Sequence, residues 1–251
     1  MADVYATKKF RWAMSPGSRT VFELALIGLI AWLVIHPLAY SPLWRLRVTH
    51  RAWVPEKVVA LTFDDGPHPI YTPALLKVLD HYGVKATFFM IGKYMEKYPE
   101  IVKQVAADGH AIGNHTYDHP YSLARDSPAQ IIGELEHCEE IIERLTGRRT
   151  HIFRPPRGMY SGRVVELANA EGYRTILWSI SADHHEAPTP ELMAQRVLTH
   201  IRPGAIILAH DGQMQSRWKD LAATPLIIEG LQKKGYRFVT IPELLRLAKR
   251  R

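Results

Sequence analysis

The segment Val58-Val59-Ala60-Leu61-Thr62-Phe63-Asp64-Asp65-Gly66-Pro67 carries the strongest structural signal in this chain. Its apolar first half predicts a buried strand, and Gly66-Pro67 predicts the turn that ends it. Asp64 and Asp65 therefore stand side by side at the C-terminal tip of that strand. Burying two neighbouring carboxylates is costly unless a cation or a proton lies between them. The pair suggests a metal site in which one acid ligates and the other moves protons, although Asp-Asp-Gly-Pro is also ordinary turn chemistry.

A second motif, His115-Thr116-Tyr117-Asp118-His119, follows the short apolar segment 111–114. Histidines at positions i and i+4 share one face of a helix and so point at one ion. With one carboxylate they form the two-histidine, one-aspartate set of a catalytic zinc-type site, which leaves positions open for water and substrate. These donors suit Zn²⁺ or Co²⁺ better than Mg²⁺. The single cysteine, Cys138, excludes a site built from thiolates.

Two further motifs also carry ionisable side chains near strand ends. The segment 206–211, Ile-Ile-Leu-Ala-His-Asp, predicts a strand with His210 at its C-terminal end. In Phe153-Arg154-Pro155-Pro156-Arg157-Gly158 the prolines favour an extended turn that fixes the position of Arg154. A lone histidine at a strand end is usually structural, but several strand tips with ionisable groups indicate one shared site.

Strand and helix patterns alternate after residue 57, which predicts an α/β fold with a parallel sheet. All four motifs fall at C-terminal strand ends, where (β/α) barrels carry their active sites. The expected strands are 58–64, 86–92, 110–115, 151–155, 175–180, 205–211 and 237–241. The expected helices are 73–82, 99–108, 128–145, 161–171, 190–201 and 220–234, with a short one near 242–250.

The four motifs TFDDG, HTYDH, FRPPRG and LAHD, in this order and spacing, resemble the polysaccharide deacetylases of carbohydrate esterase family 4, the NodB-homology domain. The resemblance runs from about Val58 to Ile241. It implies a distorted (β/α)7 barrel, here preceded by an N-terminal hydrophobic helix. It also implies a metal-dependent hydrolase that removes N-acetyl groups from an amino-sugar polymer, peptidoglycan or a related glycan, and releases acetate. The FRPPRG form is closer to members that act on peptidoglycan.

The resemblance assigns a metal site and an acid–base pair to this sequence. The implied cofactor is a divalent metal, Zn²⁺ or alternatively Co²⁺. Its expected ligands are Asp65, His115 and His119. Asp64 is the expected general base, and His210 is the expected general acid.

Three more residues support this chemistry in the family pattern. Arg154 is expected to pair with the general base and orient it. The backbone N–H of Arg157 is expected to donate to the oxyanion, and Leu208 to form a wall of the pocket for the acetyl methyl group.

One segment departs from the family pattern. The family has an Asp-Trp pair after a Trp-Ser strand, and that Asp tunes the acid histidine. Here the chain runs from Trp178-Ser179 to Asp183 and His184, with no tryptophan after the aspartate. We expect Asp183 to support His210, with His184 as the alternative occupant of that space.

The N-terminal fifty residues differ in composition from the rest. Residues 24–40 are nearly all apolar and at helical rise would span about 25 Å, a marginal length for crossing a membrane. We expect a basic segment with a membrane anchor or signal-like helix in 1–50 and the catalytic barrel in 51–251. The favoured interpretation is a single-pass anchor with the barrel outside the cytoplasm, where amino-sugar polymers lie. A cleaved signal peptide, giving a secreted protein, and a cytoplasmic amphipathic helix are the alternatives.

The net charge of +7 is concentrated near the N-terminus. Residues 1–54 hold seven Lys and Arg against two acidic residues, so only two of the net positive charges lie in the rest of the chain. Basic residues beside an apolar segment are attracted to anionic lipid headgroups. The expected partners are therefore an N-acetylated polysaccharide and a membrane, and the charge does not indicate nucleic-acid binding.

Two other functions stay open at the level of sequence. An amide hydrolase of the same fold, acting on a small non-sugar substrate, would use the same metal and acid–base groups. A non-catalytic glycan-binding relative would need no general base, so the intact set of ionisable residues counts against it. Measuring acetate release with and without a chelator separates these cases.

Overall fold

The computed structural model describes residues 42–183 and 187–249. The chain divides into two compact units, Met1–Leu43 and Trp44–Arg251. The expected hydrophobic helix at 24–40 lies outside the described residues. Within the described ranges, no helix is both long enough and apolar enough to cross a bilayer.

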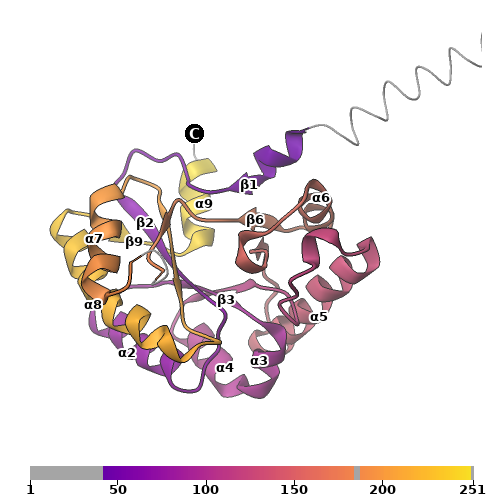
Figure 1. The fold of residues 1–251 in the computed structure, drawn as a ribbon, viewed down its shortest axis with the longest axis horizontal. Coiled ribbons are helices and arrows are strands. Elements are labelled where there is room, and N and C mark those ends of the chain that lie inside the picture. The colour runs from indigo at the N-terminus through magenta and orange to yellow at the C-terminus, as the bar shows by residue number, and fades with distance from the viewer. Residues whose placement is uncertain (1–41, 184–186, 250–251) are drawn as a thin grey trace, which may run out of the picture. The chain divides into compact units, whose positions relative to one another are not determined.

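One parallel sheet organises the second unit, and the helices surround it (Figure 1). The hydrogen-bonded strand order is β1-β6-β5-β4-β3-β2-β8-β7, and β9 also pairs with β2. The strands are β1 (Val48–Thr49), β2 (Val58–Asp64), β3 (Thr87–Met90), β4 (Ala111–Asn114), β5 (Ile152–Phe153), β6 (Arg174–Ile176), β7 (Ile180–Ser181), β8 (Ile206–His210) and β9 (Arg237–Phe238).

The connecting segments are mainly helical. The α-helices are α2 (Tyr71–His81), α3 (Gly92–Lys97), α4 (Pro99–Ala107), α5 (Pro128–Thr146), α6 (Gly162–Ala170), α7 (Pro190–His200), α8 (Trp218–Lys233) and α9 (Ile241–Lys249). The 3₁₀ helices are η1 (Pro42–Arg47), η2 (Leu123–Arg125), η3 (Pro156–Gly158) and η4 (Gln215–Arg217).

The central strand β2 is buried along its whole length and has two different faces. Val59, Leu61 and Phe63 belong to the core cluster that also holds the buried side chains of the surrounding helices. Val58 and Ala60 belong to a second cluster, with apolar residues of β3, β5, β6 and β8. Because side chains alternate along a strand, Asp64 points to the same side as Val58 and Ala60, into the space that the sheet curves around.

The structure confirms the predicted α/β class and the parallel sheet. Strand 58–64 is as expected, and helix α5 begins after Ser127, whose hydroxyl accepts a hydrogen bond from Gln130 N, and ends at Gly147. Strand β1 and helix α3 were not predicted. Both are short, so they show too little periodicity to be seen in the sequence.

The sheet is an open half-barrel in its hydrogen bonding, because the expected strand 175–180 is divided between two partners. Leu177 N still donates to Thr49 O beside β6, whereas Ser179 N donates to Ile206 O beside β8. The chain thus leaves the ladder of β6 with β1 and joins the other end of the sheet as β7. This switch explains the distortion that a strand pattern alone does not reveal.

The turn that enters β8 generates the first prediction. Gly204 has φ +76°, and a Cβ atom there would lie 1.9 Å from the backbone oxygen of Ala52. We expect Gly204→Ala to lower the free energy of unfolding by about 2 kcal/mol or more, from left-handed strain and overlap with the backbone. Urea unfolding of the purified protein measures this.

Gly133→Ala is the matched control, because Gly133 is an exposed residue inside α5 with open space around its Cα. We expect this change to raise stability by about 0.5–1 kcal/mol, since glycine is unfavourable in a helix. Equal unfolding midpoints for wild type and Gly204→Ala would contradict the packing described for this turn.

Candidate metal centre and catalytic site

Asp64 and Asp65 converge on one site because the backbone turns sharply between them. Adjacent residues of a continuous strand would point to opposite faces. Asp65 instead adopts φ 76°, a left-handed conformation that ends β2. Both carboxylates therefore lie near the His115 ring, with Asp64 Oδ2 and Asp65 Oδ1 at 3.8 and 3.5 Å from its Nε2. Both acids are buried, as the core strand before them predicts.

His115 and His119 lie in the loop after β4, so the predicted helical face is wrong for this pair. Thr116 and His119 have φ values of 67° and 61°, which an α-helix does not permit. The loop is closed by a hydrogen bond from His119 N to Thr116 Oγ1 of 3.1 Å. It brings the two imidazole rings to a centroid distance of 4.9 Å, so the pair converges by a tight turn instead.

Asp65, His115 and His119 form a buried group that fits one metal ion. Asp65 Oδ1 lies 3.5 Å from His115 Nε2 and 3.2 Å from His119 Nε2, and the three atoms are all within 4.8 Å of one another. Ligand atoms at about 2 Å from a shared ion are themselves separated by roughly 3 Å. His115 Nδ1 lies 2.7 Å from the carbonyl oxygen of Arg154. It therefore carries the proton, which leaves the Nε2 lone pair for a metal.

The charges of these three residues are also suited to a cation. Burial alone would raise the pKa of Asp65, but the contact with His115 and the nearby His210 and His119 hold it well below its usual range. Burial, and then the neighbouring His115, lower the pKa of His119 to about 3. The group thus presents one carboxylate and unprotonated imidazole nitrogen at neutral pH, which is the state that binds metal.

Asp64 is held by a buried guanidinium rather than by this group. Arg154 Nη1 donates to Asp64 Oδ1 at 2.6 Å and to Thr62 Oγ1 at 2.9 Å. The Arg154 side chain is wholly buried, and its other N–H groups donate to the carbonyl oxygens of Ile176 and Leu177. A buried charge pair requires such complete hydrogen bonding to offset its desolvation. Asp64 is therefore fixed beside the candidate ion with one oxygen directed towards it.

His210 faces this site from β8, in register with Asp64 on β2. Its Nδ1 lies 3.0 Å from Asp183 Oδ2, a close ion pair rather than a well-aligned hydrogen bond. Burial lowers the pKa of His210, but Asp183, with Asp65 and Asp64, outweighs it, so the pKa is raised overall. The other expected occupant of this space, His184, lies outside the described residues.

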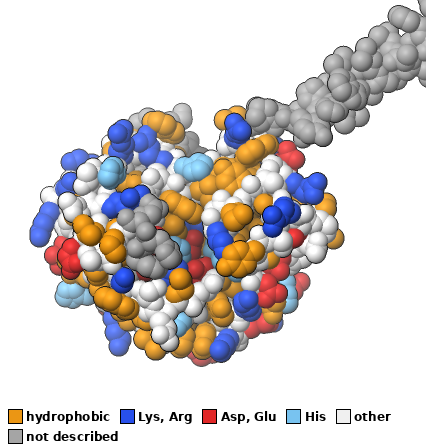
Figure 2. All heavy atoms as spheres, in the orientation of Figure 1, with side chains coloured by type: hydrophobic (Ala, Val, Ile, Leu, Met, Phe, Trp, Pro, Cys, Tyr) orange, Lys and Arg blue, Asp and Glu red, His pale blue; other side chains and the backbone are white. Residues whose placement is uncertain are grey.

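Arg157 and Leu208 also lie at this end of the sheet. Arg157 has φ 56° in the turn of η3, where Gly158 and Met159 donate back to Pro155 and Pro156. Its guanidinium stacks on the exposed ring of Tyr121, so the side chain lies at the surface. Leu208 is buried on β8, two residues before His210 and hence on the same face of the strand. In Figure 2, acidic side chains are visible within a hollow near the centre of the face shown.

Three buried residues near the site were not predicted: Asp211, Arg217 and Asp220. Asp211 accepts a hydrogen bond from Thr72 Oγ1, and burial with the nearby Asp65 and Asp64 raises its pKa to about 7. Burial also raises the pKa of Asp220 to about 6. Arg217 contacts Asp65, Asp183 and Asp220. Asp211 ends the LAHD motif but was given no role, and no motif marks Arg217 or Asp220.

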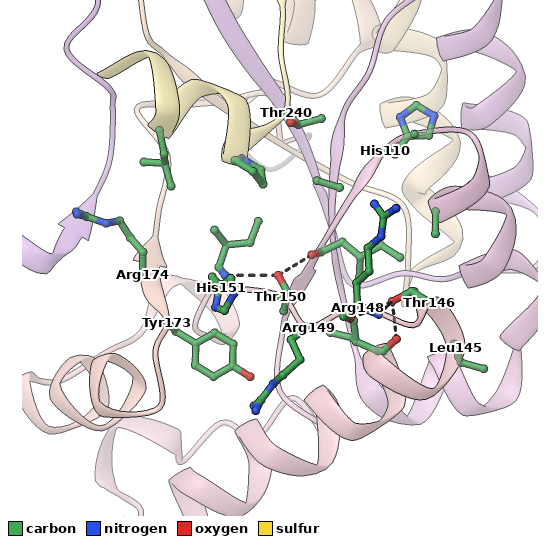
Figure 3. Close-up of a pocket in the computed structure, with 18 of the residues that line it drawn as sticks. His110, Leu145, Thr146, Arg148, Arg149, Thr150, His151, Tyr173, Arg174 and Thr240 are labelled. Carbon is green, nitrogen blue, oxygen red and sulfur yellow. Dashed lines mark hydrogen bonds between the residues drawn. The ribbon is translucent and has the colours of Figure 1, made fainter. Parts of the chain in front are cut away.

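A cavity of about 1000 Å³ lies at the opposite strand ends and is lined by none of the predicted site residues. Its lining includes five Lys and Arg, of which Arg148, Arg149 and Arg174 point in different directions (Figure 3). Arg149 lies 3.8 Å from the buried Glu139, and Arg174 turns away to Thr49. Arg149 and Arg174 thus contact neighbouring groups, and the candidate site residues lie at the C-terminal strand ends instead.

Known proteins share both this sequence and this fold. The model of a family described as polysaccharide deacetylase matches residues 52–176. A peptidoglycan-N-acetylglucosamine deacetylase of Bacillus cereus is 40% identical over 193 residues, covering 76% of this chain and 89% of that protein. A chitooligosaccharide deacetylase of Azorhizobium caulinodans is 36% identical, covering 73% of this chain and 92% of that protein.

A solved structure agrees with the sequence relatives. The crystal structure of a peptidoglycan N-acetylglucosamine deacetylase, in complex with an N-oxidanyl-benzamide compound, superposes with a TM-score of 0.77 at 34% sequence identity. The match covers 81% of this chain and 95% of that one.

The candidate metal ligands Asp65, His115 and His119 generate the second prediction. We expect His119→Ala to weaken Zn²⁺ affinity on the order of 100-fold or more, because even residues that only orient a ligand contribute 10–100-fold. Titration calorimetry of the metal-free protein measures this. His151→Ala, an exposed histidine outside the group, is the control and should bind as wild type does. Unchanged affinity in His119→Ala would remove it from the ligand set.

Proposed function

The chain belongs to the polysaccharide deacetylase family and is a metal-dependent hydrolase of N-acetylated sugars, and we propose that it removes acetyl groups from peptidoglycan. The observation that carries this proposal is that the neighbouring acids Asp64 and Asp65 have different partners. Asp65 belongs to the buried metal group, whereas Asp64 is bonded by Arg154 and keeps an oxygen beside that group. A site of this kind supplies both a metal position and a separate base.

The first half of the reaction requires an activated water and a stabilised oxyanion. Asp65, His115 and His119 would hold the metal, which when bound supplies polarisation of the acetyl carbonyl and a lowered pKa for water. Asp64 then takes the proton from the attacking water, as a base within hydrogen-bond reach. The N–H of Arg157 donates to the developing oxyanion.

The second half requires a proton for the leaving amine. An amine leaves poorly unless it is protonated, so His210 has to be charged when the C–N bond breaks. The raised pKa of His210 favours this state, and the guanidinium of Arg154 holds the Asp64 carboxylate in place by a hydrogen bond. The proposed reaction requires an acid and a base with opposite protonation states in one site. Leu208 would pack against the acetyl methyl group.

The metal is best assigned as Zn²⁺, with Co²⁺ as a functional substitute. Two imidazoles and one carboxylate are donors that these ions prefer, whereas Mg²⁺ favours oxygen ligands and retained waters. Restoring activity to the metal-free protein with each ion in turn tests this assignment. Restoration by Mg²⁺ alone would contradict it.

The substrate assignment follows from the relatives and from the FRPPRG segment around Arg157. The direct test is acetate release from peptidoglycan, chitooligosaccharides and acetylxylan, with and without a chelator. We expect chelator-sensitive release that is fastest from peptidoglycan. Release from chitooligosaccharides alone would reassign the glycan, and release only from small amides would favour the non-sugar alternative.

For localisation, we infer a membrane-anchored enzyme with its barrel outside the cytoplasm. The support is the apolar segment 24–40, its basic flanks and the extracellular position of the proposed polymer. Membrane fractionation of cells that produce the full chain tests it. A shortened chain in the medium would support the secreted alternative instead.

The role of Asp64 gives the third prediction. Asp64→Asn should keep its Zn²⁺ affinity but lose at least about 100-fold in kcat, because the base is gone while the metal group is intact. Zinc titration and acetate release on one preparation measure both. Asp118→Asn, an exposed acid in the histidine loop, is the control. Substantial activity in Asp64→Asn would exclude Asp64 as the base.

The contact between Asp183 and His210 gives the fourth prediction. Asp183 raises the pKa of His210, so Asp183→Asn should lower it. Because the acid has to be protonated, kcat declines as pH rises through this pKa. The alkaline limb of the kcat profile should therefore move to lower pH, by about one unit. An unmoved limb would mean that Asp183 does not tune the acid.

A further inference from the structure

We propose that Arg217 is a positioning residue that ties the metal ligand Asp65 to Asp183, the partner of the acid histidine. This inference rests on the proposed function, because it concerns the same site. Arg217 comes from η4, in the loop after β8, and is almost fully buried. It belongs to none of the four motifs, and it touches both halves of the catalytic apparatus.

The guanidinium distributes its nitrogens over separate partners. Nη2 lies 3.5 Å from Asp65 Oδ2, and Nη1 donates to Asp183 Oδ2 at 3.4 Å. Nε donates to the carbonyl oxygen of Gly212 at 3.2 Å, and Nη1 also lies 3.7 Å from Asp220 Oδ2. A planar fork reaches several acceptors in fixed directions, which a lysine ammonium cannot do.

The Asp65 carboxylate is divided between two tasks. Its Oδ1 faces the nitrogens of His115 and His119, and its Oδ2 faces Arg217. A ligand whose second oxygen is held by a cation cannot rotate freely, and partners of this kind set the orientation of metal ligands. Arg217 would thus restrain the orientation of Asp65 through the oxygen that does not face the histidines.

The Asp183 carboxylate is shared in the same way. Its Oδ2 lies 3.0 Å from His210 Nδ1 and 3.4 Å from Arg217 Nη1, so one oxygen lies between two cations. Arg217 therefore competes with the imidazolium for Asp183 and opposes the charging of His210. Among the described residues, the charged groups around His210 are Asp64 at the end of β2, Asp65 after it, Asp183 after β7, Asp211 after β8, Arg217 on η4 and Asp220 on α8.

A purely structural role would predict a different outcome from a positioning role. Loss of a buried cation lowers stability in either case. Only a positioning residue also changes the metal affinity and the titration of His210 together. The change in metal affinity reports on the contact of Arg217 with Asp65. The change in the titration of His210 reports on the contact of Arg217 with Asp183.

The test compares Arg217→Met, Arg217→Lys and wild type, with Arg144→Met as the control. Arg144 makes an exposed ion pair with Glu96 and receives the same substitution away from the site. Zn²⁺ affinity is measured by titration calorimetry, and kcat for acetate release is measured across pH. Arg217→Lys keeps the buried charge, so this variant can replace Arg217→Met in the comparison if Arg217→Met does not fold.

We expect both Arg217 variants to bind Zn²⁺ about 10–100-fold more weakly than wild type and the control. In Arg217→Met the alkaline limb of kcat should move to higher pH by about one unit, because the charge of Arg217 no longer competes with His210 for Asp183. Asp183→Asn moves the same limb the other way. Wild-type Zn²⁺ affinity in either variant, or a limb that stays in place or moves to lower pH, overturns the inference.

The failure of this inference is distinguishable from the failure of the proposed function. If the wild-type protein releases no acetate from any glycan, the function fails, but the calorimetric comparison still reports on Arg217. If the wild type is active and Arg217→Met binds Zn²⁺ equally well, the function stands and the positioning role is wrong.

Discussion

The structure depends on how two adjacent carboxylates are accommodated inside the protein. Asp64 and Asp65 lie at the end of a fully buried strand, where burying a carboxylate is costly unless a cation accompanies it. Arg154 supplies the cation for Asp64, at 2.6 Å. The two histidines arrange the metal position for Asp65. Because the two acids have different partners, one serves as ligand and the other is left to move protons.

Backbone strain gathers at the same end of the sheet. Among the described residues, the non-glycine positions with positive φ are Asp65, Thr116, His119, Arg157 and Gln213. All lie in loops that follow β2, β4, β5 or β8. Each such conformation costs on the order of 1–2 kcal/mol, which the rigid sheet beneath offsets. The turns at Asp65 and at 116–119 bring the three candidate metal ligands together.

The sequence was sufficient for the parallel sheet and the strand tips, because long apolar runs and ordered motifs are local signals. The sequence was insufficient where long-range contacts determine the backbone conformation or the strand pairing. The convergence of His115 and His119 comes from a left-handed loop, not a helix, and the division of 175–180 depends on which strands flank it. Arg217 was missed because only the folded charge balance, with several buried acids, shows that a second cation is needed.

The measurement that tests this account most directly is anomalous diffraction from crystals of the zinc-loaded protein. We expect one ion bonded to Asp65 Oδ1 and to Nε2 of His115 and His119, with Asp64 still paired to Arg154 and not bonded to the ion. An ion that bridges both carboxylates, or that binds away from the histidines, would contradict the separation of ligand and base.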